Sequence, residues 1–125
     1  MTDTTNAETT AIELLAQFVE QLIGLQNSAQ AAQVNGRSLQ QQFLQAQQLY
    51  QTQLLPTLMA SPTAEKFMSY QTEINRALRL LGMDVAFLQS AKNSVTLQKR
   101  QAQMQQQLQT LLAFCQGLQA AMAES

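Results

Sequence analysis

The stretch INRALRLLGMDVAFL, residues 74–88, decides the fold class of this chain. Its strongest apolar residues recur at alternating steps of four and three, at Ile74, Leu78, Leu81, Val85 and Leu88. These steps follow one face of an α-helix, because an α-helix turns once every 3.6 residues. A second stripe, made by Leu80, Met83 and Phe87, leaves this helix apolar on most of its sides. Such a helix is predicted to contact neighbours on two sides.

Extending the helical period in both directions predicts three further helices. The four predicted helices cover residues 10–34, 39–58, 62–91 and 95–122. They are separated by start and stop signals, namely Asn35-Gly36, Ser38 as an N-cap, Ser61-Pro62 and Asn93-Ser94. Connections this short place successive helices antiparallel. The sequence therefore predicts an all-α, antiparallel up-down four-helix bundle that forms a single domain over residues 10–125, after a disordered tail at residues 1–9.

Three residue types supply almost half of the chain. Gln, Leu and Ala occur 24, 19 and 17 times in 125 residues, while charged residues make up only 12%. The Gln-rich tracts at 40–53 and 98–109 are interrupted by apolar residues at helical spacing, so solvated helix faces are predicted there rather than prion-like disorder. Pro56 lacks a backbone N–H, so the second helix is expected to end or kink near it.

The absence of histidine excludes several kinds of chemistry. With no His and a single Cys, the chain lacks the ordinary ligand sets for zinc, haem and iron–sulfur clusters, and it lacks His-based acid–base or nucleophilic catalysis. We therefore expect no catalytic, cofactor-binding or metal-binding residues, and we expect that the protein is not an enzyme. Cys115 falls on the apolar seam of the last helix, where an inert core thiol is predicted.

The few charges are unevenly placed along the chain. Residues 1–36 carry four acidic residues and no basic residue (−4), and residues 37–125 carry seven basic and four acidic residues (+3), which gives the net charge of −1. This division fits either complementarity within one molecule or a head-to-tail contact between partners, and it is too weak to indicate nucleic-acid binding. No segment resembles a membrane span or a secretion signal, so a cytoplasmic location is expected.

The most apolar helix also carries the candidate contact residues. Arg76 and Arg79 project from it beside Leu80, Met83 and Phe87, and arginine next to apolar and aromatic area is typical of protein-contact surfaces. Together with Glu73, these residues form the predicted partner-binding site. The alternative is that the arginine stems only cover the core while their charged ends reach water.

An interhelical pair is predicted between the last two helices. If the chain turns near Asn93, positions that sum to about 185 face each other across antiparallel helices, which places Asp84 opposite Arg100. We expect Asp84 and Arg100 to be in contact and to fix the register of this helical hairpin.

The segment from Tyr70 to Arg100 also carries a family resemblance. Its pattern T-E-I-x-x-x-L-R-L-L-x-M-D-V-x-F-L-Q, followed by a later Gln-Lys-Arg, resembles the cyanobacterial heterocyst frequency control protein PatD family. A looser likeness covers residues 10–118, including the Phe114-Cys115 pair. The residues that match the motif are Glu73, Leu78, Arg79, Leu80, Leu81, Asp84, Val85 and Phe87.

The resemblance implies a small, non-enzymatic, cytoplasmic helical protein. Such a protein would restrain heterocyst differentiation and would modulate assembly of the tubulin-like cell-division protein FtsZ, its expected partner. A homodimer of the chain is a further expectation. The alternative class is a structural protein, either a self-assembling helical subunit or a coat on a lipid surface.

Overall fold

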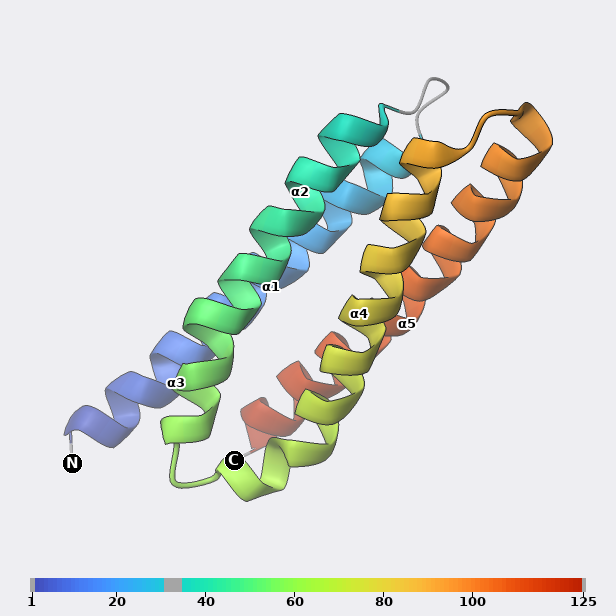
Figure 1. Ribbon diagram of the computed structural model, residues 1–125. Helices are drawn as coiled ribbons and strands as arrows, with labels where there is room; N and C mark the ends of the chain where they lie inside the picture. Colours follow the sequence, from blue (N-terminus) through green and yellow to red (C-terminus); the bar gives the residue numbers. More distant parts are fainter. Residues whose placement is uncertain (1, 31–34, 125) are drawn as a thin grey trace.

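Four helical segments run alternately up and down in the computed structural model (Figure 1). The structure describes residues 2–30 and 35–124, with the side chains of residues 2–8 left out of the description. Its elements are α1 (Thr2–Ala29), α2 (Gly36–Leu49), the π-helical turn η1 (Tyr50–Leu54), α3 (Leu55–Ala60), the 3₁₀ turn η2 (Ala64–Phe67), α4 (Met68–Ser90) and α5 (Ser94–Glu124). The described residues form no strand. The predicted all-α antiparallel four-helix bundle is confirmed.

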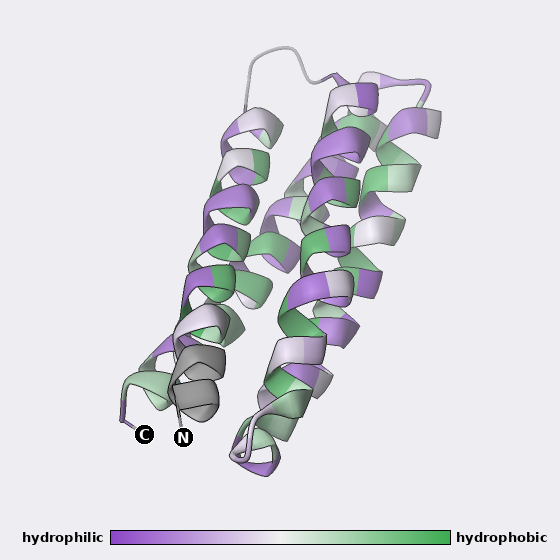
Figure 2. Cartoon of the chain, turned by 90° about the vertical axis from the view of Figure 1, so that its left-hand side faces the viewer, coloured by the Kyte–Doolittle hydropathy of each residue, from purple (hydrophilic) through white to green (hydrophobic). Residues whose placement is uncertain are grey.

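The core is built from the stripes that the helical period predicted. On α4 the buried residues are Gln71, Ile74, Ala77, Leu78, Leu81, Asp84, Val85 and Leu88. On α5 they are Met104, Leu108, Leu111, Leu112, Cys115, Leu118 and Met122. Figure 2 shows that each helix carries hydrophobic and hydrophilic residues on different sides. Burial of the hydrophobic sides is the main force that holds the four segments together.

The helices occupy the four corners of the bundle in a fixed order. α1 packs against α2 and α5, and α4 also packs against α2 and α5. The views in Figures 1 and 2 agree with this order. α1 and α4 therefore lie at diagonal corners, and their outer surfaces point away from each other.

The first helix differs from its predicted bounds at both ends. It begins at Thr2, so the backbone of residues 2–9 is helical where a disordered tail was predicted. These residues contain neither Gly nor Pro, and extending an existing helix adds one hydrogen bond for each residue fixed. At the other end the helix stops at Ala29, and Gln30 forms a turn. The rest of the predicted extension, residues 31–34, lies outside the described residues.

Asparagine side chains cap the second and the last helix. Asn35 is the N-cap of α2, because its Oδ1 accepts a hydrogen bond from the N–H of Ser38 at 3.1 Å. The prediction of Ser38 as N-cap was therefore wrong by three residues. Asn93 acts in the same way before α5, where its Oδ1 accepts from the N–H of Thr96 at 2.8 Å. The turn predicted at Asn93-Ser94 is confirmed.

Pro56 lies inside a continuous helical segment from Gly36 to Ala60. The turn just before it is π-helical, with the N–H of Leu55 donating to the carbonyl of Tyr50 five residues earlier. The wider turn gives room to the proline ring, which would otherwise press against the preceding turn. The helix therefore passes Pro56 instead of ending there, and Leu54 and Leu58 both stay buried.

α4 begins later than the predicted helix at residues 62–91. Ser61 does not start an α-helix at Pro62; its Oγ accepts from the N–H of Thr63 at 3.2 Å, and a 3₁₀ turn follows before α4 begins at Met68. The hydroxyl of Ser61 thus organises a tight turn at the end of the bundle.

Candidate interaction face on α4

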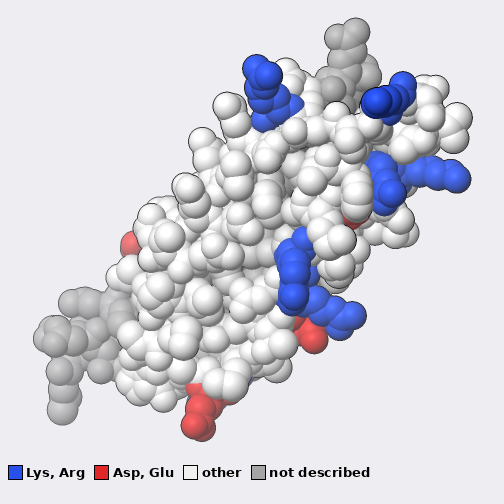
Figure 3. Space-filling view, in the orientation of Figure 1, with Lys and Arg blue, Asp and Glu red and all other residues white. Residues whose placement is uncertain are grey.

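The outer surface of α4 combines exposed apolar groups with arginine. Leu80, Met83 and Phe87 are 37%, 50% and 40% exposed, although large apolar side chains usually lie inside. Arg76 and Arg79 are exposed on the same surface, whereas the predicted Glu73 is only half-buried beside it. We call Arg76, Arg79, Leu80, Met83 and Phe87 the α4 ridge. Figure 3 shows several Lys and Arg side chains on the side of the molecule where α4 and α5 lie, and one more near the start of α2.

Hollows on both sides set the α4 ridge apart from the neighbouring helices. The hollow toward α2 is lined by residues that include Phe43, Gln47, Arg79, Gly82 and Met83. Two hollows toward α5 are lined by residues that include Glu73, Arg76, Leu80 and Phe114, and by Met83, Asp84, Phe87, Arg100 and Gln103. The structure thus places all six predicted contact residues along the rims of these hollows, and it adds residues of α2 and α5 that the sequence did not single out.

Glycine explains how closely α2 approaches α4. A Cβ atom on Gly82 would lie 2.8 Å from the ring of Phe43, closer than real Cβ contacts come. The ring of Phe43 therefore sits directly on the α4 backbone and forms the wall of the hollow toward α2. A glycine inside an otherwise apolar helix was the one available signal for this contact.

Arg100 reaches the α4 ridge from the neighbouring helix. Its guanidinium lies 4.3 Å from the centre of the Phe87 ring, a cation–π contact, and it donates to Oε1 of Gln103 at 3.2 Å. Asp84 and Arg100 line the same hollow, as their predicted facing positions require, but no ion pair joins them in the described part of the chain. The ring of Phe87 is a contact of Arg100 on α4, and the charge of Arg100 also acts on the carboxyl of Asp84.

Asp84 is an acidic side chain that lies largely buried between α4 and α5. It is only 8% exposed. Burial raises the pKa of its carboxyl above the ordinary value of 3.8, and the nearby positive charge of Arg100 partly opposes this shift. The folded state therefore favours the protonated form of Asp84 more than the unfolded state does, and Arg100 limits that preference.

The raised pKa of Asp84 predicts a pH dependence of stability. Between pH 3.8 and the raised pKa, the folded state binds more protons than the unfolded state, so the free energy of unfolding should rise as the pH falls through this interval. Asp84→Asn should remove this contribution and should be at least as stable as the wild type at pH 7. Urea unfolding of both proteins from pH 7 to pH 4 measures it. A wild-type curve that parallels the variant at every pH would contradict the prediction.

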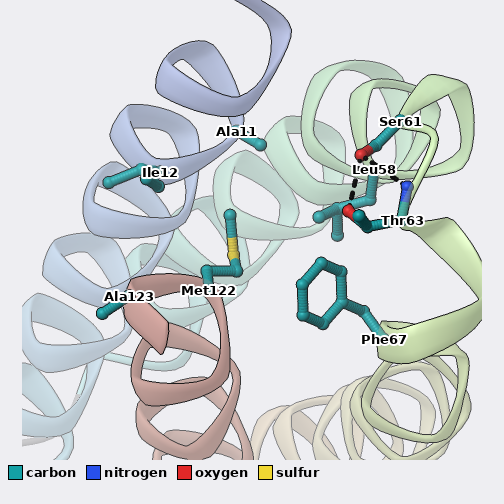
Figure 4. A pocket seen from close by; sticks show the side chains of 8 residues that line it. All are labelled: Ala11, Ile12, Leu58, Ser61, Thr63, Phe67, Met122 and Ala123. Atoms are coloured by element: carbon teal, nitrogen blue, oxygen red, sulfur yellow. Dashed lines mark hydrogen bonds between the residues drawn. The ribbon is translucent and has the colours of Figure 1, made fainter. Parts of the chain in front are cut away.

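A further pocket lies at the other end of the bundle, near the chain termini (Figure 4). It has a volume of about 250 Å³ and is lined by Ala11, Ile12, Leu58, Ser61, Thr63, Phe67, Met122 and Ala123. The hydroxyls of Ser61 and Thr63 at its edge bond to each other at 2.9 Å. None of these lining residues is titratable, so the pocket offers apolar packing and no acid–base chemistry.

Cys115 is fully buried, on the α5 seam where it was predicted. Burial raises the pKa of its thiol from 9.0 to about 12. A thiol in this environment stays protonated and unreactive, because the thiolate is the nucleophilic form.

The part of the chain that the structure describes holds neither a metal cluster nor a membrane-spanning helix. No group of three or more Cys, Asp or Glu side chains there is placed to hold a metal ion. None of the described helices is both long enough and apolar enough to cross a membrane.

The fold and the α4 ridge define the class of this protein as an antiparallel four-helix bundle with an apolar and basic outer face. Comparisons of the chain with models of protein families, with curated proteins and with solved structures found no match.

Proposed function

We propose that this protein is a non-enzymatic regulator that binds another protein through the α4 ridge. The observation that supports the proposal most strongly is the exposure of Leu80, Met83 and Phe87 beside two exposed arginines. Apolar and aromatic side chains beside arginine are enriched where protein interfaces gain most of their binding energy. The hollows on both sides of the ridge would receive side chains of the partner.

The partner we propose is the tubulin-like cell-division protein FtsZ. This choice rests on the resemblance of residues 70–100 to the PatD family, and the α4 ridge lies within that segment. By binding FtsZ in the cytoplasm, the protein would modulate FtsZ assembly and restrain heterocyst differentiation. Arg79 belongs both to the motif and to the ridge, and Met83 lies at the centre of the ridge, so these two residues are the basis of the test.

Charge reversal and charge insertion on the ridge should weaken FtsZ binding. Arg79→Glu and Met83→Glu should each lower the affinity about tenfold, because each places a carboxylate in a contact built from apolar groups and arginine. Co-sedimentation with FtsZ polymers assembled on GTP measures binding, and the extent of polymerisation measures the effect on assembly. Both side chains are exposed, so the thermal midpoint should stay nearly unchanged.

The control is Leu44→Glu, which changes a similarly exposed apolar residue on α2 that does not line the hollows beside the ridge. It should bind FtsZ like the wild type. Because the surface is poor in charge, wild-type binding should change little between low and moderate salt. If FtsZ binding is unchanged by both ridge substitutions, the proposal is contradicted. That result would favour the alternative interpretation, in which the arginine stems only cover the core. Flotation of the wild-type protein with lipid vesicles would favour the lipid-coat alternative instead.

A further inference from the structure

The outer surface of α1 complements the α4 ridge in charge and in apolar content. Glu13 and Glu20 are exposed on it, beside the exposed Ile12 and Ile23, which are 49% and 43% accessible. Ala16 is exposed between them. We call Ile12, Glu13, Ala16, Glu20 and Ile23 the α1 face. Residues 9–30 contain no basic residue, so no cation of α1 itself neutralises these two carboxylates in this stretch.

The two surfaces also match in size. The α1 face extends over 12 residues from Ile12 to Ile23, and the α4 ridge extends over 12 residues from Arg76 to Phe87, so each is about 16 Å long. At about 100° per residue, each set of five side chains falls within an arc of about 100° around its helix. Each surface is therefore a narrow strip that one helix can lay along another.

The arrangement of the bundle prevents these surfaces from meeting within one molecule. α1 and α4 lie at diagonal corners, with α2 and α5 between them. The geometry thus rules out a contact between these two particular faces inside one molecule. A contact between them requires a second copy of the chain.

We propose that the protein associates with itself head to tail, with the α1 face of one copy seated on the α4 ridge of the next. Glu13 and Glu20 would lie beside Arg76 and Arg79, and the isoleucines would pack against Leu80, Met83 and Phe87. The contact joins two different surfaces, so every added copy leaves one α1 face and one α4 ridge uncovered. Such contacts form open chains unless the rotation between copies closes a ring. The strips are small, so the association is weak and shows at high protein concentration.

Two double charge reversals test the proposal without any other partner. Glu13→Arg with Glu20→Arg should lower the self-association constant about tenfold, and so should Arg76→Glu with Arg79→Glu, because each variant presents two surfaces of like charge. Sedimentation equilibrium over a range of concentrations measures the constant. Raising the salt from about 0.01 M to about 0.1 M shortens the screening length from about 30 Å to about 10 Å and should weaken the wild-type association.

Mixing the two variants gives the decisive result. Each variant supplies the surface that the other lacks, so the equimolar mixture should associate about as strongly as the wild type. The control pair, Arg37→Glu with Glu65→Arg, reverses exposed charges outside both surfaces and should associate normally. Three results would each overturn the proposal. The wild type could stay monomeric at all concentrations, it could stop at a dimer, or the two variants could fail to associate with each other in the mixture. The Glu13→Arg/Glu20→Arg variant keeps its α4 ridge, so retained FtsZ binding would separate this proposal from the proposed function.

Discussion

Replacing Phe18 with alanine should lower the free energy of unfolding by about 3–5 kcal/mol. Phe18 is fully buried on α1, and its ring centre lies 5.3 Å from that of Tyr50 on the facing segment, with the planes tilted by 34°. Removing the ring therefore loses the free energy gained by transferring it out of water, and it loses the aromatic contact with Tyr50. It also leaves a cavity whose surrounding groups lose packing contacts. Small domains are stable by only about 5–15 kcal/mol, so this single substitution should remove a large part of the total.

Urea unfolding followed by circular dichroism measures this loss as a lower midpoint with an unchanged slope. The matched control is Ile23→Ala, which removes an apolar side chain from the same helix at a position that is 43% exposed. Its effect should stay below about 1 kcal/mol, because an exposed side chain leaves no cavity. Equal losses for the two variants would show that α1 is not packed on the bundle as the structure has it.

The sequence predicts the core of this bundle well because burial repeats with the helical period. On α4 the stripe from Ile74 to Leu88 is buried at each predicted position, and the second stripe of Leu80, Met83 and Phe87 is the one that faces outward. The prediction that this helix contacts neighbours on two sides is confirmed, because α4 packs against both α2 and α5. The second stripe stays partly exposed beside these contacts, and this exposed apolar area is the basis of the proposed interaction face.

Local signals that compete with one another were harder to resolve. Asn35 and Ser38 are both good N-cap residues, and they are three residues apart. If Asn35 is the cap, its side chain accepts a hydrogen bond from the N–H of Ser38, so Ser38 is then inside the helix. The wide turn before Pro56 depends on how Tyr50 and Leu54 both pack into the core, which is a tertiary condition. Such features need the neighbouring helices to be in place before they can be predicted.

The predicted pair of Asp84 and Arg100 shows the same limit at the level of side chains. Spacing around the turn was enough to place both residues at one hollow between α4 and α5. Spacing alone could not decide whether the guanidinium of Arg100 lies at Asp84 or at Phe87, because the arginine side chain is long and flexible. In the structure it lies over the ring of Phe87. The long side chain of Arg100 allows its guanidinium to lie over this ring while its charge still acts on the buried carboxyl of Asp84.

The thiol of Cys115 should react with iodoacetamide about a thousandfold more slowly in the folded protein than in the chain unfolded in guanidinium chloride. Burial raises its pKa from 9.0 to about 12, and at a given pH below both values the thiolate fraction falls tenfold whenever the pKa rises by one. The side chain is also fully enclosed by the core, so reaction requires the bundle to open. The rate of labelling followed by mass spectrometry measures the effect, and fast labelling of the folded protein would contradict the placement of α5.

The raised pKa of Cys115 also predicts how stability changes in alkali. Because burial keeps the proton on the folded state, the folded chain binds more protons than the unfolded chain between pH 9.0 and about 12, and stability falls as the pH rises. The loss should approach about 1.4 kcal/mol for each pH unit above 9. Burial also raises the pKa of Tyr50 above its ordinary value of 10.0, so the interval from pH 9 to pH 10 reports mainly on the thiol. In that interval Cys115→Ala should show a flatter dependence than the wild type, since alanine has no proton to release, and equal slopes would mean that the thiol is not buried as described.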